Sequence, residues 1–169
     1  MVTTHNLGFP RIGRKRELKF ALEKYWKKEI SEQALLDAAI TLQTQHWQDQ
    51  ALLDWIPVGD FSLYDHVLDT SFMLGNVPAR VSVLTGNDMD SYFRAARGRA
   101  VIDDAAHSCV NASEMTKWFD TNYHYIVPEF DENTHFSLNP ERLVRQIKQA
   151  QQIHHQVKPV ILGPVTYLW

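Results

Sequence analysis

The chain has 169 residues, of which 44% are hydrophobic and 11% aromatic, so it can bury a core of its own. Its net charge of −3 does not favour binding to nucleic acid or to a membrane surface, and no apolar run approaches the roughly 18–20 residues that span a bilayer. The single cysteine, Cys109, excludes an internal disulfide framework, and with an amino terminus that lacks a secretory signal it predicts a cytoplasmic protein.

Strands and helices are predicted to alternate along the first half of the chain. Residues 3–9 can form a short strand that is ended by proline and glycine. Apolar residues recur at helical spacing over residues 14–29, and Ser31 is a suitable N-cap for a second helix. Residues 55–61 (WIPVGDF) are typical of a buried strand, and residues 64–74 of the helix after it.

The second half is predicted to continue this alternation, with strands at residues 123–127 and 159–162 and helices at residues 91–97 and 140–156. Asn139 and Pro140 supply an N-cap and a first helical residue for the longer helix. A Gly-Pro pair interrupts the last strand before an apolar run to Trp169. The pattern predicts one α/β domain with a parallel sheet of about four strands, and an end inside an apolar run suggests truncation.

The most informative local feature is the basic segment RIGRKRELK at residues 11–19. Its cations fall in the first turns of the predicted helix, where the helix dipole makes each exposed cation unfavourable by about 0.3–1 kcal/mol. A bound anion would reverse that sign, because backbone N–H groups and cations would converge on it. The alternative is a solvated basic helix start that Glu17 partly neutralises.

Three other groups of polar residues could carry chemistry. Asp60, Asp65 and His66 follow a predicted strand, where they suit acid/base work or metal binding, or equally an N-cap and polar packing. His107 and Cys109 have zinc-ligand character, but without a second cysteine they do not predict a structural zinc site. The segment TKWFDTNYHY at residues 116–125 mixes polar and aromatic side chains, as a pocket wall does, although such aromatics are more often core.

Five longer blocks of sequence occur in a fixed order: LGFPRIG at residues 7–13, RELK at 16–19, VGDFSLYDHVLDTS at 58–71, EMTKWFDTNYHY at 114–125 and KPVILGPVTYLW at 158–169. Together they closely resemble the N-terminal domain of the cobalamin-independent methionine synthases. The resemblance covers essentially the whole chain and is weakest over residues 81–110.

The resemblance implies two (βα)8 TIM barrels set face to face, with residues 1–169 forming the N-terminal portion, about half, of the first. It implies a methyltransferase of methionine biosynthesis, which moves a methyl group from 5-methyltetrahydropteroyltri-L-glutamate to homocysteine. Zinc activates the homocysteine thiol in a C-terminal barrel that this chain lacks. The chain alone is therefore expected to have no catalytic residue, no metal and no activity.

The resemblance also implies which residues bind the glutamyl tail of the folate: Lys15, Arg16, Glu17, Leu18 and Lys117, extended to their neighbours Lys19 and Asn122. The resemblance gives no role to Asp60, Asp65 and His66. The alternative is a stand-alone module that binds a polyanion or an acidic partner. Because half a barrel leaves open sheet edges, the chain is also expected to self-associate.

Overall fold

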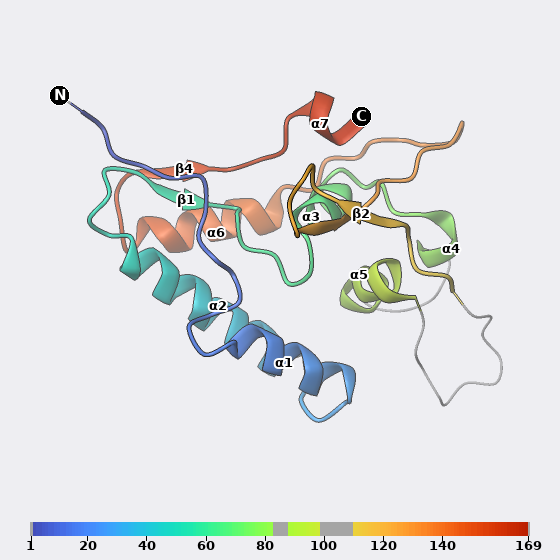
Figure 1. Ribbon diagram of the computed structural model, residues 1–169, viewed down its shortest axis with the longest axis horizontal. Helices are drawn as coiled ribbons and strands as arrows, with labels where there is room; N and C mark the ends of the chain where they lie inside the picture. Colours follow the sequence, from blue (N-terminus) through green and yellow to red (C-terminus); the bar gives the residue numbers. More distant parts are fainter. Residues whose placement is uncertain (1, 83–87, 99–109, 169) are drawn as a thin grey trace. The chain divides into compact units, whose positions relative to one another are not determined.

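The computed structural model describes residues 2–82, 88–98 and 110–168 (Figure 1). The chain forms two compact units, Met1–Leu63 with Pro140–Ile161 and Tyr64–Asn139 with Leu162–Trp169. None of the helices in the described ranges is long and apolar enough to cross a bilayer.

The first unit contains a parallel strand pair and three helices: α1 (Glu17–Trp26), α2 (Glu32–Asp49), β1 (Ile56–Val58), α6 (Glu141–Gln151) and β4 (Val157–Pro159). β1 pairs with β4, and a parallel bridge joins His5 to Trp55 just before β1. α6 packs on both strands (Figure 1), and the strands and helices enclose a core of Trp47, Ile56, Val58 and Ala150. This alternation of strand and helix confirms the predicted α/β class.

In this unit, a sequence prediction is confirmed where the predicted feature depends only on residues close by in the chain. The Ser31 hydroxyl accepts the backbone N–H of Ala34 at 3.2 Å, so Ser31 caps α2 as predicted. The predicted first strand is reduced to the single bridge at His5. Gly59 follows β1 with φ +84°, and a Cβ there would lie 2.8 Å from Cδ1 of Leu143, so this exit from the strand requires glycine.

The described residues of the second unit form an antiparallel strand pair and four helices: α3 (His66–Met73), α4 (Ala79–Ser82), α5 (Asp88–Arg97), β2 (Met115–Lys117), β3 (His124–Ile126) and α7 (Pro164–Leu168). The strand predicted over residues 123–127 is present as β3, but it pairs with β2 in a hairpin. The prediction of about four parallel strands was therefore wrong for this strand. β2, with the sequence MTK, gave no strand signal because its three residues are all exposed.

The last apolar stretch also differs from the prediction. Residues that were expected to continue a strand form the short helix α7, which begins at Pro164. Proline at a first helical position has a suitable φ and gives up no hydrogen bond, and short apolar runs do not distinguish strand from helix. Tyr167 anchors this helix: its hydroxyl lies 2.8 Å from Ser71 Oγ and 2.9 Å from Asn76 Nδ2.

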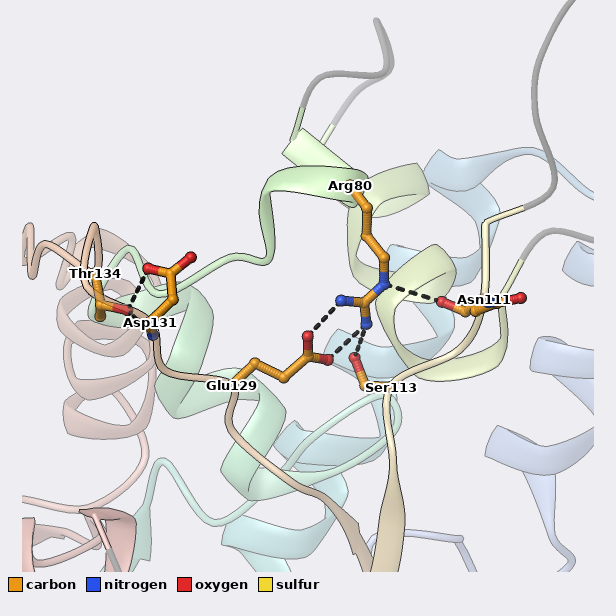
Figure 2. A network of polar contacts seen from close by, with 6 residues as sticks. All are labelled: Arg80, Asn111, Ser113, Glu129, Asp131 and Thr134. Atoms are coloured by element: carbon orange, nitrogen blue, oxygen red, sulfur yellow. Dashed lines mark hydrogen bonds and ion pairs between the residues drawn. The ribbon is translucent and has the colours of Figure 1, made fainter.

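A polar network holds the ends of the hairpin to α4 (Figure 2). The Arg80 guanidinium donates to both oxygens of Glu129, to Ser113 Oγ at 3.0 Å and to the carbonyl of Asn111 at 3.2 Å. Its bonds to Glu129 hold the pKa of that carboxyl below its usual range. Since the Arg80 and Glu129 charges satisfy each other, the network joins backbone segments and does not form an open charged site.

Candidate functional site

Residues 11–16 of the basic segment lie in a turn ahead of α1, and not in the first turns of the helix as predicted. α1 begins at Glu17, and Arg16 is its N-cap in the left-handed conformation, with φ 62° and ψ 34°. The Arg16 N–H donates to the Gly13 carbonyl at 3.2 Å, and the Leu18 N–H donates to the Ile12 carbonyl at 3.1 Å. Residues 11–18 are called the basic turn below. The predicted conflict with the helix dipole is therefore smaller than the sequence indicated.

Two arginines of the basic turn have partners within the first unit. Arg11 Nη1 donates to the carbonyls of Ser62 at 3.2 Å and Leu63 at 2.9 Å. Arg14 forms a 2.9 Å ion pair with Asp49 at the end of α2. Both side chains therefore fix the turn to the unit beneath it.

Lys15 and Arg16 are the exposed cations that remain in the basic turn. Across the described ranges, no acidic group forms an ion pair with either side chain. Lys19 lies in the first turn of α1, where it forms a loose pair with Glu23 at 3.7 Å. Lys15 and Arg16 are thus the two side chains best placed to meet a carboxylate from outside the chain.

The other two residues of the predicted set in this turn face inward or bond locally. Leu18 is 0% exposed, so its side chain belongs to the core. The Glu17 carboxylate accepts the Lys15 N–H at 2.8 Å. Hydrogen bonds from its own backbone N–H and from that of Lys15 hold the pKa of Glu17 below its usual value.

The remaining predicted residues lie on the β2–β3 hairpin of the second unit. Lys117 is exposed directly opposite His124, and Asn122 is exposed in the connecting loop. The loop is ordered by local bonds: the Trp118 N–H donates to the Tyr123 carbonyl at 2.7 Å, and His124 Nδ1 lies 3.1 Å from the Asn122 carbonyl. The structure thus gathers Lys15, Arg16 and Glu17 in one turn, and Lys117 and Asn122 on one hairpin.

The aspartates after β1 have structural partners. Asp60 accepts the Phe9 N–H at 2.8 Å in the first unit. Asp65 is the N-cap of α3 in the second unit, with bonds from the N–H groups of Val67 and Leu68. The N-cap interpretation is therefore confirmed for Asp65.

Metal ligands are not grouped in the part of the chain that the structure describes. No set of three or more His, Cys, Asp or Glu side chains there could hold a metal ion. His107 and Cys109 lie outside the described residues.

His46 is a titratable residue beside the basic turn, and the sequence analysis predicted no role for it. It is 7% exposed on α2, with its ring centroid 4.7 Å from that of Phe9. Burial lowers its pKa, while Asp60, Asp49 and Glu17 oppose this effect and Arg14 adds to it. Its spacing with Leu42 marked it only as part of a helix face, so the sequence held no separate signal for it.

The stability of the chain is expected to fall as the pH drops below about 6.5, the pKa of histidine in an unfolded chain. Below that pH the unfolded chain binds a proton that buried His46 resists, so protonation favours unfolding; above it His46 has no such effect. Urea unfolding between pH 7.5 and pH 5 measures this change. His46→Gln should flatten the dependence, and His155→Gln, an exposed control, should leave it in place. An equal slope in His46→Gln would contradict the assignment.

Comparison with known proteins agrees with the family resemblance of the five sequence blocks. Residues 3–169 match the family model described as cobalamin-independent synthase, N-terminal domain. The chain is 56% identical over 173 aligned positions to the 5-methyltetrahydropteroyltriglutamate–homocysteine methyltransferase of Saccharophagus degradans. That alignment includes 100% of this chain and 23% of the relative, so the chain spans about a quarter of the relative's length. The chain therefore belongs to the family of cobalamin-independent synthase N-terminal domains.

Proposed function

We propose that the chain is the N-terminal segment of a methyltransferase that converts homocysteine to methionine with 5-methyltetrahydropteroyltri-L-glutamate. The relative's name supports this reaction, and the identity of 56% supports carrying it over. Homocysteine, and the zinc that activates its thiol, would bind in the larger remainder of the protein. The chain's own residues would contribute binding and not chemistry.

We further propose that this segment binds the glutamyl tail of the folate. The observation that carries the proposal is the pair of exposed cations, Lys15 and Arg16, on a turn fixed by its neighbours. A polyglutamate presents one carboxylate for each residue, and guanidinium and ammonium groups bind carboxylates through charge-assisted hydrogen bonds. Lys117, an exposed cation on the β2–β3 hairpin, is proposed as a further folate contact from its place in the family block at residues 114–125.

A (βα)8 barrel is proposed for the first unit when it is joined to the rest of the protein. Its support is the parallel order from His5 through β1 to β4, with helices in the connections. Parallel neighbours joined by helices are the repeating unit of such a barrel. The β2–β3 hairpin would then be an insertion between two barrel strands. Self-association of the isolated chain stays a prediction.

Substituting the cations tests the tail-binding proposal. In the full-length protein, Lys15→Ala, Arg16→Ala and Lys117→Ala should each raise KM for the triglutamate folate roughly two- to tenfold. Because a remote tail contact is felt equally in the ground and transition states, kcat should change little. Raising the salt concentration should reduce the effect, since the contact is ionic. Steady-state kinetics with triglutamate and monoglutamate folates provide the measurement.

The matched control is Lys24→Ala, which removes an exposed cation on α1 beyond the basic turn. It should leave both KM values unchanged. Equal losses for the monoglutamate and triglutamate substrates would show that these cations do not bind the tail.

A further inference from the structure

The basic turn already holds a carboxylate of its own. Glu17 Oε2 lies 2.8 Å from the Lys15 backbone nitrogen and accepts its N–H. The N–H of Arg16 donates to the Gly13 carbonyl and that of Leu18 to the Ile12 carbonyl. The backbone donors of Lys15, Arg16 and Leu18 thus have acceptors inside the chain. An incoming anion would meet the side chains of Lys15 and Arg16 and find these backbone groups occupied.

The conformation of the turn depends on this carboxylate. Arg16 has φ 62°, a left-handed conformation that is unfavourable for a residue with a Cβ. The Glu17 carboxylate accepts the N–H of Lys15, so the side chain of Glu17 closes a short ring around Arg16. This bond offsets the unfavourable conformation and holds Lys15 and Arg16 on a fixed backbone.

Gly13 makes room for the carboxylate. A Cβ at this position would lie 2.2 Å from Glu17 Oε2 and 2.9 Å from Leu42 Cδ2, and φ here is +86°. No larger residue fits without moving the Glu17 side chain. Gly13 and Glu17 therefore act together, Gly13 by its lack of a side chain and Glu17 by its bond to the Lys15 N–H.

We propose that Glu17 is a positioning residue for tail binding, one that organises the basic turn and does not itself contact the ligand. The proposal rests on the proposed function, because it concerns how Lys15 and Arg16 are presented to the glutamyl tail. A turn fixed before binding loses less conformational freedom on binding, which strengthens affinity.

The sign of the effect distinguishes this role from simple electrostatics. A carboxylate near an anionic tail repels it, so repulsion alone predicts that removing Glu17 strengthens binding. An organising role predicts the opposite, because the turn leaves its binding conformation when the carboxylate is lost. The acceptor oxygen matters for this role more than the charge does.

The test measures Kd for triglutamate and monoglutamate folates in the full-length protein by isothermal titration calorimetry, and takes the ratio as the contribution of the tail. Glu17→Ala should lower the monoglutamate-to-triglutamate Kd ratio roughly three- to tenfold, the effect of losing a cap-like bond. Glu17→Gln should retain most of the ratio, since its amide oxygen can still accept the Lys15 N–H. Gly13→Ala should lower the ratio as Glu17→Ala does, because it displaces the carboxylate.

Each outcome has one meaning. A ratio that rises or stays unchanged in Glu17→Ala, while Lys15→Ala and Arg16→Ala lower it, overturns the positioning role and leaves the proposed function standing. A ratio that none of these variants lowers overturns both. Should Glu17→Ala not fold, Glu17→Asp gives the same test, because its shorter side chain falls short of the Lys15 N–H. The monoglutamate Kd reports damage to the rest of the site.

Discussion

Replacing Asp65 with alanine is expected to lower the free energy of unfolding by about 3–5 kcal/mol, the range for breaking a buried, fully bonded charge network. Asp65 is 1% exposed. Its carboxylate accepts hydrogen bonds from α3 and from the β2–β3 hairpin. Within α3 it caps the N–H groups of Val67 at 3.2 Å and Leu68 at 2.9 Å. From the hairpin it accepts the Tyr123 hydroxyl at 2.7 Å and the Ile126 N–H at 3.0 Å.

The alanine variant would leave the buried N–H groups of Val67, Leu68 and Ile126 without this acceptor. Each such group costs about 1–3 kcal/mol unless water replaces the bond. Denaturant unfolding followed by tryptophan fluorescence measures the change. Glu132→Ala is the matched control, because Glu132 is an exposed carboxylate of the same unit. A loss below 1 kcal/mol for Asp65→Ala would mean that water enters and satisfies the donors.

Leu18→Ala is expected to destabilise the first unit by about 2–5 kcal/mol, as large-to-small substitutions in a core do. Leu18 is 0% exposed although it stands in the segment assigned to the folate tail. Its effect on tail binding should therefore arise through folding, and the monoglutamate-to-triglutamate Kd ratio of the folded variant should stay near that of the unmodified protein.

Phe20→Ala on the same helix is the control, because Phe20 is 50% exposed and should lose less than about 1 kcal/mol. Urea titration gives the stabilities, and calorimetry at a temperature where both variants are folded gives the ratio. A large loss of tail preference in a folded Leu18→Ala protein would contradict a purely structural role.

The sequence predicted those features whose physical cause lies within a few residues. Ser31 caps α2 through a bond to a residue three positions later, and β1 lies inside the predicted apolar strand. The family blocks are likewise contiguous, so they identified the family that the match over residues 3–169 confirms. The choice of Lys15, Arg16 and Lys117 came from that resemblance and remains a proposal.

Only the tertiary structure decided which polar groups have hydrogen-bond or ion-pair partners inside the chain. Arg14 pairs with Asp49, 35 positions later in the chain, and so is withdrawn from the cations open to a ligand. Asp65 bonds to Tyr123 and Ile126, which are 58 and 61 positions away, and this turned a candidate acid/base residue into a structural one. Such partners are set by how distant segments pack together, and neither helical periodicity nor capping preference contains that information.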